Sequence, residues 1–333
     1  MTQVNEIKEQ KHPVKEVPKQ SGFELDMGTV IRTMLASGGL KKMRVMKPDE
    51  LRYIRPTREY DLPEYHESMP HRTSNEKFLR PTRYCNPREP LVIAMANELG
   101  SHELSDWEFA NAAYWFVKTK LVLEFLPFDS VSETLKRGTG TCYHLISVWI
   151  ALCRAAGIKA RYKTFKMRVP EQVTTITEAT VGDTTAIDIF DTGGTPEGEG
   201  EACIDGKWEV AHLAFRPEIA AAGGLPVTKF GEDAIGNTFD LVPGTIKRFE
   251  SISLRLALLL KTAMWLAPAA MERANVFFHM KTLPFGRKIL ETAGGIEAYD
   301  QNIRRMRELL SAEDITSKLT AERKQLIEFR SDE

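Results

Sequence analysis

The sequence lacks several features that define common protein classes. Its 333 residues include only four cysteines, Cys85, Cys142, Cys153 and Cys203, which are too few for a disulfide-stabilised scaffold of this length. No two of them have the Cys-x-x-Cys spacing, so the sequence does not indicate a structural zinc site. Positive and negative charges nearly cancel, with 45 Lys and Arg against 46 Asp and Glu. The chain therefore has no overall basic charge of the kind that favours nucleic-acid binding.

The sequence also lacks a long apolar run. Its most apolar stretch, residues 251–270, contains Arg255, Lys261 and Pro268, whereas a membrane-spanning helix needs about 20 nearly uncharged residues. Residues 1–20 are polar and mixed in charge, without the apolar segment of a signal peptide or membrane anchor. We therefore expect a cytoplasmic protein with reduced thiols, in which 251–270 forms a buried or surface-lying helix.

Hydrophobic residues make up 42% of the chain, which is enough for a globular protein with its own core. We expect residues 1–20 to be a disordered tail. Residues 21–89 are expected to form an N-terminal helix, near 28–43, followed by an extended wrapping segment rich in proline and arginine. Residues 90–245 should form the core domain, and 246–333 a C-terminal helical region.

The hydrophobic pattern predicts helices before and after a group of strands. Helical spacing is found at 90–100, 105–125 and 142–157, and again at 249–281, 286–310 and 313–330. Strands are expected at 158–169 and 185–190, and a hairpin at 202–215 with Asp205-Gly206 as a type I′ turn. Ser105 and Ser311 are the expected N-caps of two of these helices. This order of elements indicates an α+β fold rather than alternating βαβ units.

Cys142 occupies the position most suggestive of chemistry. Gly138 and Gly140 precede it and permit a tight, closely packed turn, and an apolar helix follows it. Unpaired N–H groups and the helix dipole stabilise an anion at such a position. The sequence therefore predicts a nucleophilic thiol with a lowered pKa, and an oxyanion hole made by the same N–H groups. Cys153 and Cys203 fit ordinary packing positions.

The segment from Ser132 to Phe165 resembles the core of the transglutaminase-like superfamily of papain-type thiol enzymes. It has the Gly-x-Cys motif before a buried helix, and the run Arg154-Ala-Ala-Gly-Ile-Lys-Ala-Arg-Tyr162 after that helix. The hairpin Glu201–Trp208 resembles the second and third core strands of the family, so the resemblance spans about residues 90–215. It implies a papain/transglutaminase-like α+β core, in which the helix bearing the cysteine packs on an antiparallel sheet.

The resemblance also implies a Cys–His–Asp triad, and two of its positions are exchanged here. Cys142 matches, but Glu197 stands where the histidine is expected and His212 where the aspartate is expected. In one interpretation His212 carries the proton and Glu197, or its neighbour Glu199, orients it. A carboxylate beside the thiol then raises the thiol pKa unless His212 compensates. A second interpretation shifts the hairpin register and pairs His212 with Asp240, and a third treats the domain as non-catalytic.

Two nearby features carry separate expectations. His144 is rotated by about 200° from Cys142 around the helix, so we expect it to be structural. The run Glu197-Gly-Glu-Gly-Glu201 is expected to be a solvated loop that contains one functional glutamate and is flexible enough to act as a lid.

The resemblance implies cysteine-dependent acyl-group chemistry of the hydrolase or acyltransferase type. Cys142 attacks a carbonyl to form a thioester, His212 carries the proton with Glu197 as its acidic partner, and water or an amine resolves the thioester. This chemistry needs no cofactor and no metal. One alternative is a non-catalytic domain that binds a peptide or protein, and another is a thiol-dependent cyclase or amide-forming enzyme acting on a small molecule. The expected partner is an amide- or acyl-containing substrate and not a nucleic acid. The apolar surface of 249–281 is expected to be buried against the core or a second subunit, and contact with a membrane surface is the alternative.

Overall fold

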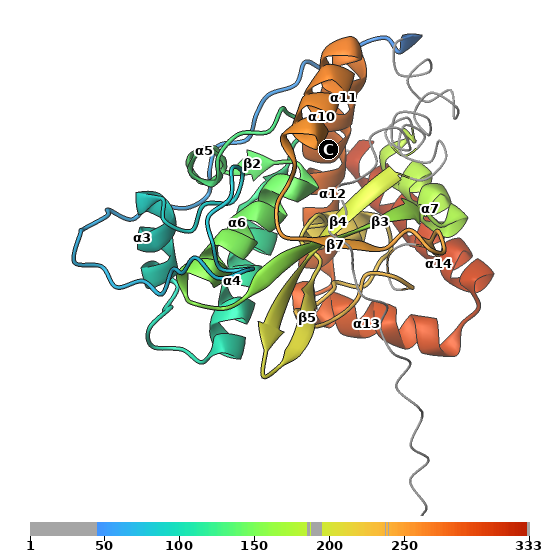
Figure 1. Cartoon of the computed structure of the whole chain (residues 1–333). Coiled ribbons are helices and arrows are strands. Elements are labelled where there is room, and N and C mark those ends of the chain that lie inside the picture. The colour runs from blue at the N-terminus through green and yellow to red at the C-terminus, as the bar shows by residue number, and fades with distance from the viewer. Residues whose placement is uncertain (1–44, 185–186, 188–194, 237, 239, 332–333) are drawn as a thin grey trace, which may run out of the picture.

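The structure is a computed structural model that describes residues 45–184, 187, 195–236, 238 and 240–331. The tail predicted at 1–20 and the helix predicted near 28–43 lie outside these residues. Figure 1 shows the helices of the first half of the chain on the left of a central sheet, with the last two helices on the right. Residues 45–89 run largely without regular structure over the left-hand helices, as expected for a wrapping segment.

Three helices of the first half confirm predicted ones, namely α3 (Pro90–Glu98), α4 (Asp106–Lys120) and α6 (Cys142–Ala155), and a further helix, α5 (Val131–Arg137), lies between α4 and α6 in the sequence. Ser105 caps α4, and the Ser105 N–H donates a hydrogen bond to the Glu108 carboxylate at 3.0 Å. The predicted continuation of α4 to residue 125 is wrong. There the chain forms β1 (Val122–Leu123), which pairs in parallel with β2 (Thr139–Gly140). These ladder bonds hold the turn that precedes Cys142.

The sheet contains β3 (Ala160–Arg168), β4 (Thr195–Ile204), β5 (Lys207–Ala211), β6 (Asp240–Leu241) and β7 (Lys247–Phe249). Its order is β5-β4-β3-β6, β7 also pairs with β3, and every pair is antiparallel. The predicted strand at 158–169 and the hairpin are confirmed. Asp205 and Gly206 have φ of 50° and 78°, as a type I′ turn requires. The strand predicted at 185–190 lies outside the described residues except for Ile187, which is helical.

The Glu197–Glu201 run lies inside β4, so the predicted solvated loop is wrong. Its glutamates are buried, and its glycines pack directly against α6. A Cβ at Gly200 would lie 2.6 Å from the Trp149 ring, and one at Gly198 would lie 2.8 Å from Ile146. The alternating glycines are therefore needed because the strand passes directly against the helix.

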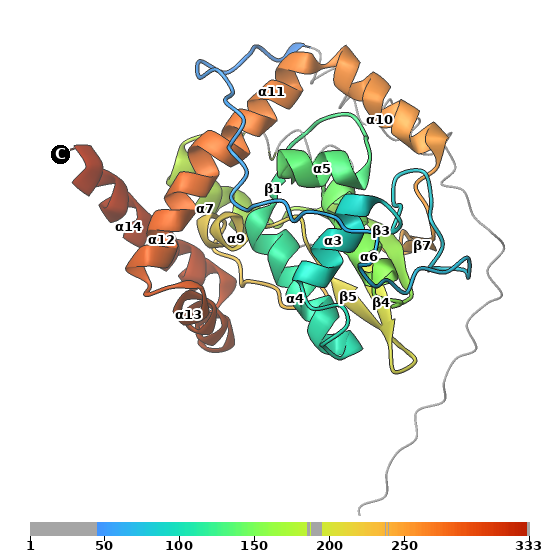
Figure 2. The same cartoon turned by 90° about the vertical axis from the view of Figure 1, so that its left-hand side faces the viewer.

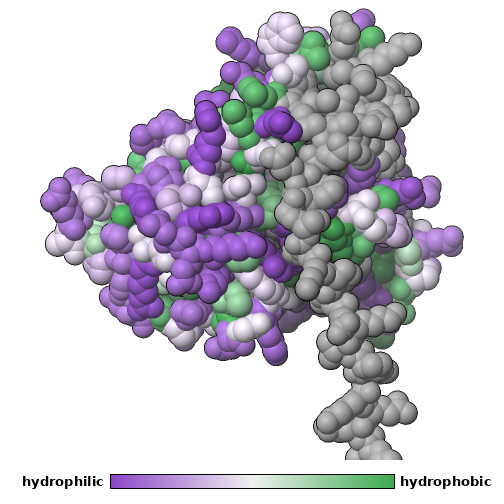
Figure 3. Space-filling view, in the orientation of Figure 1, coloured by the Kyte–Doolittle hydropathy of each residue, from purple (hydrophilic) through white to green (hydrophobic). Residues whose placement is uncertain are grey.

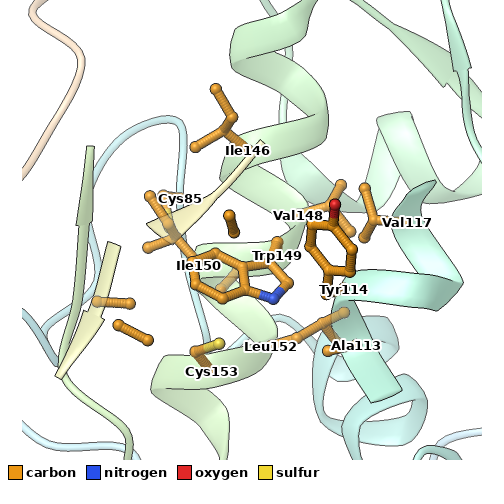
Figure 4. Close-up of a cluster of buried hydrophobic side chains, with 14 of the residues drawn as sticks. Cys85, Ala113, Tyr114, Val117, Ile146, Val148, Trp149, Ile150, Leu152 and Cys153 are labelled. Carbon is orange, nitrogen blue, oxygen red and sulfur yellow. The ribbon is translucent and has the colours of Figure 1, made fainter. Parts of the chain in front are cut away.

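The α6 helix forms the centre of the main hydrophobic core. All of its residues after Cys142 are buried, and Trp149 lies in the middle of the cluster shown in Figure 4. The Trp149 indole N–H donates a hydrogen bond to the Ala110 carbonyl on α4 at 3.0 Å. The start of α6, and with it Cys142, is thus held by a helix that has little freedom to move.

The rest of the chain is mainly helical, with α7 (Glu171–Val181), α9 (Pro217–Ala222), α10 (Leu254–Leu266), α11 (Pro268–Val276), the π-helical η1 (Phe277–Thr282), α12 (Leu283–Thr292), α13 (Ile296–Leu309) and α14 (Ala312–Ser331). Two predicted helices prove to be broken. The first begins only after β7 and bends at Ala267, immediately before Pro268. The second breaks at Gly294 and Gly295, both at positive φ. The Ser311 hydroxyl caps α14 as predicted, accepting a hydrogen bond from the Asp314 N–H at 3.2 Å.

The α10 helix exposes apolar side chains, namely Leu254, Leu258 and Trp265, the last of them 76% exposed. Figure 3 shows hydrophobic side chains near the top of the molecule, where α10 and α11 lie. Among the described residues no single helix is long and apolar enough to cross a membrane, and only α10 together with 268–292, a pair bent by 90°, passes such a test. The predicted contact of 249–281 with a membrane surface or second subunit stays a prediction, as do the domain boundaries.

Candidate active site

A glycine-containing turn places Cys142 at the first position of α6. Gly138 ends α5 at φ 78°, and a Cβ at Gly140 would overlap the Cβ of His144. The Thr141 N–H donates a hydrogen bond to His144 Nδ1 at 3.1 Å, and His144 Nε2 lies 3.4 Å from the Asp129 carboxylate. His144 is buried in these contacts, so it has the structural role expected of it.

The Cys142 sulfur meets two backbone donors and one carboxyl group. The backbone N–H groups of Tyr143 and Gly198 are near enough to lower the pKa of the thiol, and the Glu197 carboxyl is near enough for its charge to raise it. Cys142 keeps part of its surface exposed, whereas Cys85 and Cys153 are buried. The turn, the helix start and β4 therefore converge on this one sulfur.

The prediction of a lowered pKa for Cys142 is wrong. Burial raises the pKa of this thiol well above its ordinary value of 9.0, and the negative charge of Glu197 raises it further. The two N–H donors act in the opposite direction but do not outweigh these effects. The sequence-based expectation that a carboxylate at position 197 raises the thiol pKa agrees with this direction.

Glu197 is buried beside the thiol. Its side chain is on β4, its residue is 5% exposed, and its Oε1 has no hydrogen-bond partner among the described residues. Burial raises the pKa of this carboxyl to about 8, and the neighbouring charge of Glu199 contributes to the rise. At neutral pH the resting site therefore holds a thiol next to a mostly protonated carboxyl.

This ionisation predicts how stability depends on pH. Because the folded-state pKa of Glu197 is raised from 4.5 to about 8, its contribution to stability is fully present below pH 4.5 and is lost as the pH rises to about 8. We expect Glu197→Gln to raise the melting temperature by about 4 °C or more at pH 9 and by less than about 1 °C at pH 4. Calorimetry at the two pH values checks this, and an equal effect at both would contradict the buried, raised carboxyl.

Cys142 and Glu197 share the wall of a cavity of about 110 Å³. Most of the other lining side chains are apolar and come from β3, α9, η1 and the segments next to them, including Met167, Ile219 and Phe277. The sequence analysis identified Cys142 and Glu197 but missed the contribution of the C-terminal region. The adjacent Phe277 and Phe278 were a signal for it, since they are part of an apolar surplus that one helical stripe does not require.

His212 contacts a residue of the cavity wall, Phe215, but is not itself in the described lining. It follows β5, is fully buried, and packs edge-on against Phe215 with ring centroids 5.8 Å apart. Phe215 lines the cavity, whereas His212 is not among the described residues that do so. Burial, together with the positive charges of Lys118 and Lys163, lowers the pKa of His212 well below 6.5. Its predicted role as the proton carrier stays a prediction.

The surroundings of His212 are a buried polar cluster. Lys118 donates hydrogen bonds to the His212 carbonyl at 2.9 Å and to Thr228 Oγ1 at 2.7 Å, and His212 Nδ1 lies 3.4 Å from the same hydroxyl. Burial lowers the pKa of Lys118 to about 7. This cluster fixes the end of β5 against α4.

The other candidate carboxylates have structural partners. Glu199 pairs with Lys163 at 2.7 Å and accepts the Ala234 N–H at 3.1 Å, and Glu201 pairs with Arg161 at 2.7 Å. Asp240 is exposed on β6, opposite Arg168 of β3. The interpretation that pairs it with His212, which is fully buried, stays a prediction. Among the described residues no three or more His, Cys, Asp or Glu are grouped to hold a metal ion.

Comparison with known proteins gives two matches. Residues 93–186 match the family model of the transglutaminase-like superfamily, a segment that contains Cys142 and β3 but ends before Glu197 and His212. A solved structure described as a "putative cysteine protease" from Cytophaga hutchinsonii is 21% identical with a TM-score of 0.29, and the match spans 53% of this chain and 51% of that protein. No curated protein matches the chain. The segment 93–186, which carries the candidate nucleophile at the head of α6, is therefore similar to the transglutaminase-like superfamily.

Proposed function

We propose that the protein is a cysteine-dependent enzyme that cleaves or transfers acyl groups, with Cys142 as nucleophile and Glu197 as the proton acceptor. The observation that carries the proposal is that the Cys142 thiol and the buried Glu197 carboxyl lie in the wall of the same cavity, where the charge of Glu197 raises the thiol pKa. A nucleophile with a base beside it is the minimum that acyl transfer requires.

The chemistry proceeds through a thioester. The Cys142 sulfur attacks the substrate carbonyl carbon as the Glu197 carboxylate accepts the thiol proton, and the bond to the leaving oxygen or nitrogen then breaks. The leaving group takes up a proton from the Glu197 carboxyl or from water. Water or an amine next attacks the thioester, releasing the acid or amide and restoring the thiol. Because the resting thiol is neutral, proton transfer accompanies attack rather than preceding it.

Two observations favour Glu197 over His212 as the acceptor. Glu197 lines the same cavity wall as Cys142, whereas His212 is not in the described lining. The pKa of about 8 at Glu197 is also close to neutral pH, while the pKa of His212 is well below 6.5. A general base is most effective when its pKa lies near the operating pH.

Acylation by p-nitrophenyl acetate tests the proposal. We expect rapid acid quenching and peptide mass spectrometry to locate the acetyl group on Cys142, with the release of one p-nitrophenolate per site. Cys142→Ser should lower the rate by about 10³-fold or more. Cys203→Ser is the matched control, since Cys203 is also a partly exposed thiol, and it should retain the acylation. Equal rates in all three proteins would overturn the proposal.

The second candidate is a non-catalytic domain that holds a ligand in the same cavity. The raised pKa of Cys142 favours it, because an unreacted thiol in an apolar site behaves as a packing residue. The ester experiment separates the two functions, since a binding domain acquires no acetyl group on Cys142.

A further inference from the structure

The cavity beside Cys142 is lined mainly by apolar side chains. Its walls consist of apolar side chains from separate parts of the chain. They include Met167 and Val169 at the end of β3 and just after it, Ile219 on α9, and Phe277 and Phe278 on η1. Apart from Cys142 and Glu197, the only polar side chains in the described lining are the hydroxyls of three threonines, Thr177, Thr238 and Thr282. The walls therefore present mainly carbon to an occupant.

We infer that the acyl group accepted by this site is a short apolar chain of about four to six carbons, whose carbonyl meets Cys142 while its hydrocarbon fills the cavity. The inference rests on the proposed function and narrows its substrate class. Transfer of apolar surface from water into such a cavity is favourable, whereas an unpaired polar or charged group entering it pays a desolvation cost.

The size of the cavity limits the length of the chain. A dry apolar cavity of about 150 Å³ holds one benzene molecule, with six carbons. The volume here is about 110 Å³, which by the same scale accommodates a hydrocarbon of about four to six carbons. An acetyl group leaves most of this space unfilled, and a chain of ten carbons does not fit within it.

The same walls disfavour an extended peptide as the occupant. Each peptide unit brings an N–H and a carbonyl that need partners when they are buried. The described lining offers Glu197 Oε1 and Thr282 Oγ1 as buried polar atoms without a partner. Two such atoms serve the head of one acyl group but not a polypeptide.

A series of p-nitrophenyl esters tests the inference through the reaction. We expect the second-order rate constant for acylation of Cys142 to rise by about 20-fold or more from acetate to hexanoate, because each buried CH₂ is worth up to about fourfold. The rate constant should fall again at decanoate. A rate constant that does not change with chain length would overturn the inference while leaving the proposed function intact.

Substitutions at Val173 test whether this cavity makes the selection. Val173→Phe places a ring in the space and should lower the hexanoate-to-acetate ratio by about tenfold, whereas Val173→Ala should move the optimum toward longer chains. Val227→Ala is the matched control, because Val227 is buried in the same hydrophobic cluster but is not in the described lining, and it should keep the wild-type ratio. If Val173→Phe does not fold, Val173→Ala decides, and an unchanged optimum counts against the inference.

Reversible binding tests the cavity without any catalysis. Hexanamide should slow the alkylation of Cys142 by iodoacetamide at pH 9 and raise the melting temperature, and acetamide at the same concentration should do neither. Protection by hexanamide without ester acylation would support the cavity and overturn the proposed function. Equal effects of the two amides would overturn the inference.

Discussion

Replacing Glu197 with glutamine is expected to lower the rate of Cys142 acylation at pH 9 by about 10² to 10⁴-fold, the usual contribution of a general base. The reason is that glutamine keeps the size of the side chain but cannot accept the thiol proton. In the wild-type protein the carboxyl has a pKa of about 8, and only its ionised form is a base. The acylation rate should therefore rise with pH, level off above about pH 8, and lose this dependence in the Glu197→Gln variant. Stopped-flow release of p-nitrophenolate between pH 6 and pH 10 measures both.

His212→Asn distinguishes the two candidate proton carriers. If Glu197 is the base, this variant keeps a rise in rate centred near pH 8, even where burial of the new amide lowers the melting temperature. If His212 is the base, the rise disappears in His212→Asn and persists in Glu197→Gln. The midpoint of the pH–rate profile separates the two cases. A purely structural effect of His212→Asn changes the size of the acylation rate but not the pKa of the group that controls it.

The Gly286→Ala substitution is expected to cause the largest loss of stability outside the main core. Gly286 lies in α12 where this helix packs on α9, and a Cβ there would overlap the backbone carbonyl of Glu218. A backbone atom cannot move aside as a side chain can, so the two helices must separate. Overpacking usually costs about 1–3 kcal/mol, and we expect the upper end of that range or more. In a chain of 333 residues this corresponds to a fall in melting temperature of about 4 °C or more.

Gly223→Ala is the matched control for this substitution. Gly223 ends α9 in a right-handed helical conformation, and a Cβ there would make only ordinary contacts, at 3.4 Å or longer. It should change the melting temperature by less than about 2 °C. A similar fall in both variants would show that the close approach of α12 to α9 is not what Gly286 provides.

The Gly286→Ala substitution also tests whether the C-terminal helices shape the cavity. α12 continues directly from η1, which brings Phe277, Phe278 and Thr282 to the cavity. Separation of α12 from α9 should therefore weaken the preference for hexanoate over acetate in Gly286→Ala, measured at a temperature where the variant is still folded. The C-terminal region is in this respect part of the site rather than an appendage to it.

Most of the core elements could be predicted from local patterns. The apolar spacing of α6, the capping residues Ser105 and Ser311, and the Asp205-Gly206 turn are each decided by residues within a few positions of one another. Cys142 was identified in the same way, because the start of a buried helix is a local feature. The resemblance to the transglutaminase-like superfamily followed from the same segment, which the family model matches.

The incorrect predictions depend on residues that are distant in the sequence. The chain after Lys120 is extended because Val122 and Leu123 pair with the turn at 139–140, and the predicted loop at 197–201 is a buried strand because it packs between β3 and β5. Neither pairing is visible from local propensity. The breaks at Ala267 and at Gly294-Gly295 fall at proline and glycine, so the sequence did contain a signal for them.

The amino-acid sequence is sufficient to place a cysteine at the head of a buried helix, and it predicts that a glutamate and a histidine have exchanged places. It does not set the pKa of the thiol, because that value depends on burial and on the distance to Glu197, which reaches Cys142 from another element. Nor does it determine the shape of the cavity, whose walls come from segments between Leu123 and Thr282. Helix position is decided by interactions a few residues apart, whereas ionisation and cavity shape are decided by contacts across the whole chain.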